Sequence, residues 1–139
     1  MAKKGFNFNF FIIILNIFLI DFFSKYFLLN LFELENKGRV FVTRFLDLVL
    51  VYNPGISYGI FSNGGEIQRI FLIVLSVIII AYLIYWIRSS TSKFLSFGLC
   101  LIIGGALGNM VDRIIYGKVV DFISLHVFDY YWYVFNIAD

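Results

Sequence analysis

The sequence predicts an α-helical integral membrane protein with three transmembrane helices and a small extracytoplasmic β-sheet. First, 61% of its 139 residues are hydrophobic and 14% are charged, whereas about a quarter of the residues in a soluble domain are charged. Second, three apolar runs, residues 8–29, 70–87 and 94–113, are each long enough to cross a bilayer as a helix. Third, residues 30–66 form a polar stretch, part of which has the composition of β-strands.

The length and composition also limit the function. The chain has room for one domain, so we treat residues 1–139 as a single membrane-embedded unit. The net charge of +2 is small and the basic residues are scattered, so no nucleic-acid partner is expected. Cys100 is the only cysteine and His126 the only histidine, and neither has a neighbour at metal-ligand spacing. We therefore expect no intramolecular disulfide and no zinc site.

The first apolar run follows Lys3 and Lys4, so it resembles a secretory signal peptide. It is too long for the apolar region of such a signal, and no small-x-small cleavage site follows it. We interpret it as a retained transmembrane helix. Asp21 and Lys25 lie near its far end, spaced i,i+4 with the acid first, which favours a helical ion pair. The favoured interpretation is an internal pair whose lysine snorkels to the interface; the alternative is an acid that helps to fix a polar site.

The polar stretch after this run predicts a small sheet. Residues 40–52 are rich in β-branched and aromatic side chains and predict one or two strands. Asn53, Pro54 and Gly55 then break the pattern with turn-forming residues. We expect the sheet to lie on the outer membrane surface, because a loose polar linker would not need so many aromatic residues.

The distribution of basic residues predicts the orientation. The second apolar run ends in an aromatic cluster of the kind found at membrane interfaces, and a short polar turn joins it to the third. Four basic residues fall on one side of the membrane: Lys3, Lys4, Arg88 and Lys93. The positive-inside rule makes this side cytoplasmic. The N-terminus is then cytoplasmic, and residues 30–66 and everything after Asp112 lie outside.

Polar residues gather at the end of the third run and in the segment after it, although polar groups are costly beside hydrocarbon. Gly104 and Gly108 form a small-xxx-small pair that predicts close helix packing, which would hold Asn109 against a neighbouring backbone. An aromatic segment, expected at headgroup level, separates Asp121 from Asp139 and could fold back to bring the two acids together. Two carboxylates in one site of low dielectric constant hold one proton between them, which suits aspartic hydrolysis. Solvated loop residues and an ion path are the alternative explanations of these acids.

Five motifs follow one another along residues 21–139. They are Asp21-x-x-Ser24-Lys25, Asn53-Pro54-Gly55-Ile56-Ser57-Tyr58-Gly59, Gly104-Gly105-Ala106-Leu107-Gly108-Asn109-Met110-Val111-Asp112-Arg113, Gly117-Lys118-Val119-Val120-Asp121-Phe122 and Phe135-Asn136-Ile137-Ala138-Asp139. In this order they resemble the lipoprotein signal peptidases, also called type II signal peptidases. Each motif alone is weak, but five in order on the expected topology are specific.

The resemblance implies an aspartic endopeptidase of the bacterial inner (cytoplasmic) membrane. Members remove signal peptides from prolipoproteins, cutting before a cysteine that carries diacylglycerol, so the implied partners are diacylglyceryl-modified prolipoproteins and membrane lipids. No metal or cofactor is implied, and cyclic peptide antibiotics such as globomycin are expected to inhibit this chain. The implied site lies near the outer face of the membrane and comprises the catalytic acids Asp121 and Asp139, the substrate-binding residues Asn53, Asn109, Arg113 and Asn136, and the supporting residues Asp21, Lys25, Gly55, Gly108 and Asp112.

The sequence departs from the family pattern in two places. Tyr58 stands where the family usually has Phe, which keeps the ring and adds a hydroxyl. The family continues after the final Ala-Asp into a fourth transmembrane helix, whereas this sequence stops at Asp139. The expectation is therefore a truncated or fragmentary chain without the fourth helix, and with little or no activity in its 139-residue form.

Two other functions are consistent with parts of the sequence. A small membrane transporter or ion-binding subunit could use Asp112, Asp121 and Asp139 as a cation path. An inactive, truncated relative could bind lipoproteins without cutting them. The ordered motifs argue against the first function, and the intact pair of acids argues against the second.

Overall fold

Three long helices dominate the computed structural model, which describes residues 8–55 and 65–139. They are α1 (Phe8–Tyr26), α3 (Gly65–Ser89) and α4 (Lys93–Ile115). A π-helical turn, η1 (Phe27–Leu31), extends α1, so three spans in the described part of the chain are long and apolar enough to cross a membrane: Phe8–Leu31, Gly65–Ser89 and Lys93–Ile115. The predicted class, a helical membrane protein with a small sheet, is confirmed. Helix α3 begins before its apolar run, because a polar first turn with Glu66 and Arg69 precedes it.

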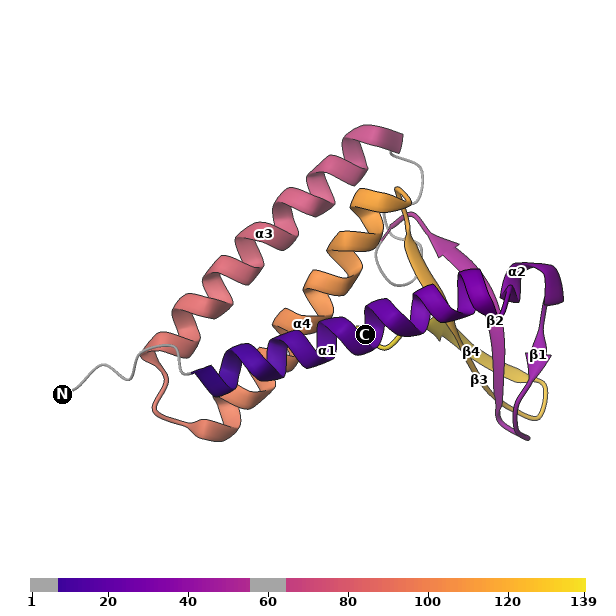
Figure 1. The fold of residues 1–139 in the computed structure, drawn as a ribbon, viewed down its shortest axis with the longest axis horizontal. Helices are drawn as coiled ribbons and strands as arrows, with labels where there is room; N and C mark the ends of the chain where they lie inside the picture. Colours follow the sequence, from indigo (N-terminus) through magenta and orange to yellow (C-terminus); the bar gives the residue numbers. More distant parts are fainter. Residues whose placement is uncertain (1–7, 56–64) are drawn as a thin grey trace.

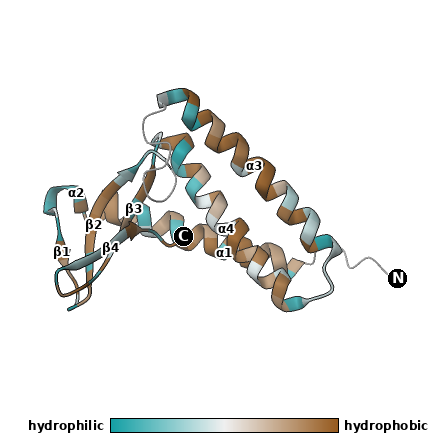
Figure 2. Cartoon of the chain, turned by 180° about the vertical axis from the view of Figure 1, so that it is seen from behind, coloured by the Kyte–Doolittle hydropathy of each residue, from teal (hydrophilic) through white to brown (hydrophobic). Residues whose placement is uncertain are grey.

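The three helices converge at the end where Ser89 and Lys93 connect α3 to α4, and α1 diverges from α3 toward the sheet (Figure 1). An apolar cluster holds the convergent end: Ile14, Leu83, Ile87, Leu99, Cys100 and Ile103. Elsewhere the helices present mostly hydrophobic residues along their length (Figure 2). Such a surface suits a lipid environment, where exposed apolar side chains contact acyl chains.

A four-stranded antiparallel sheet lies at the other end of α1 (Figure 1). Its strands, in spatial order, are β1 (Val40–Phe41), β2 (Leu46–Asn53), β3 (Val119–Val127) and β4 (Tyr130–Phe135). The prediction of one or two strands in residues 40–52 is confirmed, since both β1 and β2 form there. Strands β3 and β4 were not predicted from the sequence. The β-branched pattern of the segment after α4 is interrupted by acids and aromatic residues, which indicated a polar site and a membrane interface instead.

An apolar cluster fixes the sheet against the helical part of the chain. Leu28 of η1 and Leu34 of the short helix α2 (Leu34–Lys37) pack with Phe122 of β3 in a second apolar cluster. Antiparallel pairing of β2 with β3 then sets Val51 opposite Asp121 and Asn53 opposite Val119. The end of β2 is thereby brought beside the acidic residue of β3.

Helices α1 and α4 pack closely through the predicted glycine pair. A Cβ atom at Gly104 would lie 2.7 Å from Cβ of Ile17, and a Cβ atom at Gly108 would overlap the carboxylate of Asp21. A larger side chain at Gly104 would displace α1, and one at Gly108 would displace the Asp21 carboxylate. The small-xxx-small packing is confirmed, and it places the polar residues of the two helices face to face.

Candidate active site

Asp121 and Asp139 line one cavity of about 600 Å³ where α4 meets the sheet. Asp121 is 2% exposed in β3, whereas Asp139 follows β4 and is more exposed. The remaining lining residues combine polar groups from β2 and α4 with an apolar wall from β3 and β4: Asn53, Gly55, Asn109, Arg113, Val119, Leu125, Trp132, Tyr133, Val134 and Phe135. The sheet thus does bring the two acids together across the aromatic segment, as the sequence suggested.

Both carboxylate oxygens of Asp121 accept side-chain hydrogen bonds. Asn53 Nδ2 donates to Oδ2 at 3.1 Å, and Asn136 Nδ2 donates to Oδ1 at 2.7 Å. Burial raises the pKa of Asp121 from 3.8 to about 6; the bond from Asn53 opposes this shift, the charge of Asp139 adds to it, and Asn136 and Lys25 oppose it. A carboxyl group with a pKa near 6 can gain or lose a proton near neutral pH, as general acid–base catalysis requires.

Asp139 is held by a reciprocal turn with Asn136. Asn136 Oδ1 accepts hydrogen bonds from the backbone N–H groups of Ala138 and Asp139 at 2.8 and 3.2 Å. Asp139 Oδ2 accepts in return from the backbone N–H of Asn136 at 3.3 Å. This exchange is the geometry of a capping box. It fixes the second acid relative to the residue that binds the first.

Asn109 and Asn136 link the two acids. Asn109 Nδ2 donates to Asp139 Oδ1 at 3.0 Å, and Asn109 Oδ1 accepts from Asn136 Nδ2 at 3.0 Å. Asn136, which is 2% exposed, also donates to Asp121. A continuous path of amides therefore runs from one carboxylate to the other.

A buried cluster of two acids and one lysine lies behind this path, between α1 and α4. Lys25 Nζ is 2.6 Å from Asp21 Oδ2 and 2.7 Å from Asp112 Oδ2. Lys25 is 2% exposed, so the expectation that it snorkels to the interface is wrong. The reason is that Asp112 of α4 supplies a second carboxylate, which the spacing within α1 alone did not reveal. We call Asp21, Lys25 and Asp112 the ion triad.

The ion triad also holds the backbone beside each acid. Asp112 Oδ2 accepts from the N–H of Val120 at 3.0 Å, and Asp21 Oδ1 accepts from the N–H of Ala138 at 3.1 Å. Val120 and Ala138 directly precede Asp121 and Asp139 in the sequence. The predicted internal pair of Asp21 with Lys25 is confirmed, and the alternative hypothesis, an acid that helps to fix a polar site, also agrees with these contacts.

Arg113 and the Asn53–Gly55 turn close another side of the cavity. Arg113 donates through Nη2 to Gly55 O at 2.9 Å and through Nη1 to Asn109 O at 3.2 Å. Its Nε is buried and has no hydrogen-bond partner among the described residues. Gly55 N–H donates to Asn53 Oδ1 at 3.0 Å, which turns the Asn53 amide toward Asp121.

The site therefore contains the predicted residues from all five motifs, but part of it was not foreseen. The reciprocal turn has a sequence signal, Asn136-x-x-Asp139, because an amide and an acid three residues apart are typical of a helix start. Gln68, which donates to Pro54 O at 3.1 Å, was missed because it lies at the edge of an apolar run. The loop residues Ser57, Tyr58 and Gly59, and Lys3 and Lys4, lie outside the described residues.

Comparison with known proteins gives concordant matches. The family model described as signal peptidase (SPase) II matches residues 13–139. The lipoprotein signal peptidase of Rhodopseudomonas palustris strain TIE-1 is 50% identical over 120 residues, which cover 84% of this chain and 73% of that protein. The lipoprotein signal peptidase of Pelagibacter ubique strain HTCC1062 is 40% identical over 137 residues, which cover 98% of this chain and 81% of that protein.

Two solved structures share the fold. Both are described as a bacterial membrane enzyme, one at 2.3 Å and one at 1.9 Å resolution, and both are 30% identical to this chain. The first has a TM-score of 0.84, with 100% of this chain and 83% of that chain covered. The second has a TM-score of 0.81, with 100% and 88% covered.

Proposed function

We propose the function of this chain from one premise: the chain belongs to the signal peptidase II family, whose model matches residues 13–139. It is accordingly a membrane-embedded peptidase, with three helices in its described part that can cross a membrane. Its proposed reaction is removal of the signal peptide from diacylglyceryl-modified prolipoproteins, by cleavage before the lipidated cysteine. The names of its relatives support this substrate. They give no support to an ion-binding or transport subunit.

The observation that carries an aspartic mechanism is the pairing of Asp121 with Asp139 in one cavity, where burial raises the pKa of Asp121 to about 6. We assign the shared proton to Asp121, because it is the buried member of the pair. Asp139, the other acid of the cavity, then serves as the base. The two acids then differ in environment and in role, as in other enzymes with paired carboxylates.

The proposed reaction has two steps, and two protons move in each. Asp139 accepts a proton from a water molecule, whose oxygen forms a bond to the scissile carbonyl carbon, while Asp121 donates its proton to the carbonyl oxygen. As the tetrahedral intermediate collapses and the C–N bond breaks, Asp139 gives the proton that it took from water to the leaving nitrogen. One hydroxyl group of the intermediate returns a proton to Asp121, so both acids regain their starting states. Water and amide are thereby converted into a carboxylic acid and an amine, with no other reactant.

Substrate binding is assigned to the polar rim and the apolar wall of the cavity. Arg113 lines the cavity and, as a fixed cation with planar donors, can bind a substrate carbonyl. Asn53 and Asn136 keep the Asp121 carboxylate in place during binding. Trp132 and Phe135 form part of an apolar wall that suits a lipid-modified residue. Membrane lipids contact the rest of the helical surface.

The proposed location is the bacterial inner membrane with the N-terminus in the cytoplasm. Arg88 and Lys93 lie at the end of the helices away from the sheet, where the positive-inside rule favours the cytoplasm. The site, beside the sheet, then opens near the outer face. A lipidated substrate anchored in the outer half of the bilayer would reach the two acids without leaving the membrane.

The decisive experiment is cleavage of a synthetic diacylglyceryl prolipoprotein by the purified chain in lipid. Asp121→Asn and Asp139→Asn should each lower the cleavage rate by roughly 10³-fold or more. Asp129→Asn, which removes an exposed carboxylate at the β3–β4 turn, is the matched control and should cleave normally. Addition of a chelator should have no effect. Cleavage by the unmodified chain would correct the expectation of little or no activity in the 139-residue form. Normal cleavage by either site variant, or no cleavage by the unmodified chain, would overturn the proposed function.

A further inference from the structure

Gln68 is a buried polar side chain on a helix that contributes none of the cavity-lining residues. It lies in the first turns of α3 and is 8% exposed. Its Nε2 donates to the backbone oxygen of Pro54 at 3.1 Å. A buried amide at the end of an apolar helix is costly unless its hydrogen bonds are made. The bond to Pro54 O therefore satisfies part of the hydrogen-bonding capacity of the Gln68 amide.

Pro54 lies within the turn that aims Asn53 at the catalytic acid. Two successive carbonyl groups of this turn are held from two helices: Gln68 of α3 binds Pro54 O, and Arg113 of α4 binds Gly55 O at 2.9 Å. Within the turn, the N–H of Gly55 donates to Asn53 Oδ1, which leaves Nδ2 directed at Asp121 Oδ2. The turn is therefore clamped on both helices at the point where strand β2 ends.

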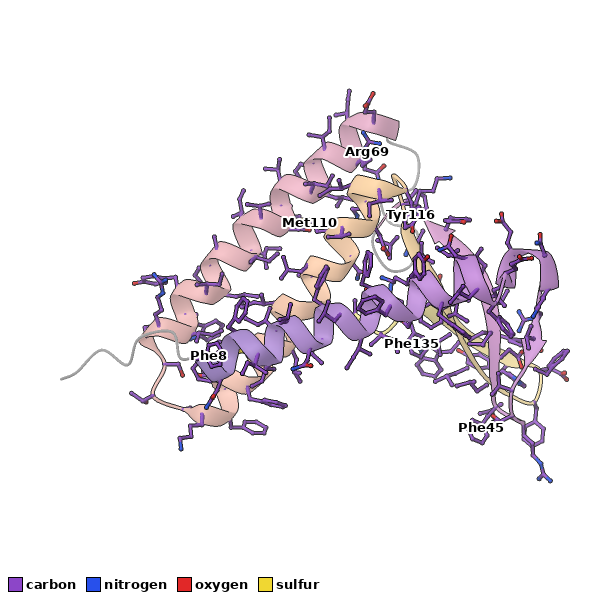
Figure 3. The ribbon with its side chains drawn as sticks, viewed as in Figure 1. Phe8, Phe45, Arg69, Met110, Tyr116 and Phe135 are labelled. Carbon is purple, nitrogen blue, oxygen red and sulfur yellow. The ribbon has the colours of Figure 1, made fainter. Side chains whose placement is uncertain are left out.

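The position of Gln68 in the fold supports this role. Arg69, the next residue, lies at the same end of the molecule as Tyr116 at the end of α4 (Figure 3). Pro54, Gln68 and Lys118 line one small cavity there, which is separate from the cavity that Asp121 and Asp139 line. Gln68 thus holds the turn from outside the catalytic cavity, which it does not line.

We propose that Gln68 is a positioning residue for the peptidase reaction: by holding Pro54 it keeps the Asn53 amide on the Asp121 carboxylate. This proposal rests on the proposed function for its kinetic consequence, but its structural consequence can be measured without substrate. Loss of the Gln68 bond lets the turn move and weakens the bond from Asn53 to Asp121. Since that bond favours the ionised form of Asp121, its loss raises the pH at which Asp121 titrates.

The test uses Gln68→Leu and Gln68→Met, which keep much of the side-chain volume and lack the amide donor. Ser76→Ala is the matched control, because Ser76 lies on the same helix and its hydroxyl binds only within α3, to Leu72 O. The Asp121 carboxyl is followed by ¹³C NMR against pH in micelles, and cleavage is followed against pH in lipid. Circular dichroism checks that each variant is folded.

Both Gln68 variants should raise the titration midpoint of Asp121, in the same direction as Asn53→Ala. They should lower kcat by about tenfold, the effect of one hydrogen bond of ordinary strength, with KM changed by less than about twofold. In a double-mutant cycle, Gln68→Leu should add little to Asn53→Ala, because the two residues act through one contact. Ser76→Ala should change neither quantity.

An unchanged Asp121 midpoint in the Gln68 variants, or full additivity with Asn53→Ala, would overturn the proposal. If one variant fails to fold, the other provides the same comparison. In the unmodified chain, a nuclear Overhauser contact must also connect the Gln68 side-chain amide with Pro54, and its absence would overturn the proposal without any substitution. Failure of the unmodified chain to cleave, with the Asp121 shift present, would count against the proposed function alone.

Discussion

The two ends of the α1–α4 pair are held together by opposite means. At one end, Ile14 of α1 packs with Leu99 and Ile103 of α4 in an apolar cluster. At the other end, the same two helices are joined by Lys25 between the carboxylates of Asp21 and Asp112. Both ends are buried, so they do not differ in exposure to solvent. They differ because the ion pairs and hydrogen bonds of one end are directional, whereas the apolar contacts of the other end are not.

The difference shows what the charged end contributes. Apolar contacts are non-directional and tolerate small shifts of one helix along the other. The ion triad instead fixes single hydrogen bonds to Val120 and Ala138, the residues that precede the two acids. Burying three charged groups costs more in desolvation than apolar packing would. The gain is that one cluster places both Asp121 and Asp139.

Lys25→Met is the strongest test of this comparison. It leaves two buried carboxylates without their cation, so the free energy of unfolding should fall by about 3–5 kcal/mol. Equilibrium unfolding in mixed micelles measures this change, and the cleavage assay should show no activity. Arg69→Met removes an exposed ion-pair partner of Glu66 and should cost under about 1 kcal/mol.

A triple variant separates stability from placement. Asp21→Asn combined with Lys25→Met and Asp112→Asn removes all three charges, so most of the lost stability should return. Activity should remain low, because the acceptors for Val120 and Ala138 are weaker. Full recovery of cleavage would contradict the view that the ion triad positions the acids.

The pH dependence of stability is the next largest expected effect. The pKa of Asp121 is raised from 3.8 to about 6 in the folded chain, so the folded state binds the proton more tightly than the unfolded state. Its contribution to stability is fully present below about pH 4 and is lost as the pH rises through 6. A rise of the pKa from 3.8 to about 6 corresponds to a change of roughly 3 kcal/mol in the free energy of unfolding.

Asp121→Asn removes this titration. The variant should therefore show a flatter decline in the free energy of unfolding between pH 4 and pH 7 than the unmodified chain. Unfolding in micelles across this pH range measures the difference. Asp129→Asn, at an exposed turn, should leave the decline as it was. An identical decline in Asp121→Asn would mean that Asp121 does not hold the extra proton.

The apolar end and the polar end of the α1–α4 pair also differ in how far the sequence predicts them. The apolar end follows from composition, since a run such as residues 70–87 admits few structures other than a membrane helix. The polar end depends on pairs that are distant in sequence: Lys25 with Asp112, and Gln68 with Pro54. Spacing within one helix predicts the Asp21–Lys25 pair but does not reveal Asp112, the third member of the ion triad. The sequence therefore did not predict that Lys25 is buried.

Strands β3 and β4 were missed for a different reason. The β-branched residues Val119, Val120 and Ile123 predict a strand. The acids and aromatic residues of the same segment instead indicate a polar site beside an aromatic segment at headgroup level. The family motifs predict the site residues without giving the contacts among them. The roles of Asp21 and Asp112 as acceptors for backbone N–H groups required the fold.

Gly105→Ala tests the polar end with one methyl group. A Cβ atom at Gly105 would overlap the carbonyl oxygen of Ala138, which is backbone and has to move. Overpacking of this kind costs about 1–3 kcal/mol of stability, and the displaced Ala138 should carry Asp139 away from Asn109. Cleavage should therefore fall more steeply than stability. The control is Gly98→Ala, where a Cβ atom would meet no neighbour within 4 Å.

Ile103→Val is the smallest expected effect and tests the apolar end. Ile103 is 1% exposed and lies two residues before Gly105 on α4, in the apolar cluster. Removing one methyl group should lower the free energy of unfolding by about 0.5–1.5 kcal/mol, toward the lower value because the lipid-solvated state also contacts the side chain. The kcat of cleavage should stay within about twofold, because no hydrogen bond to Val120 or Ala138 depends on this residue. A loss of kcat as large as that of Gly105→Ala would mean that the apolar end also positions the acids, and the distinction between the two ends would not hold.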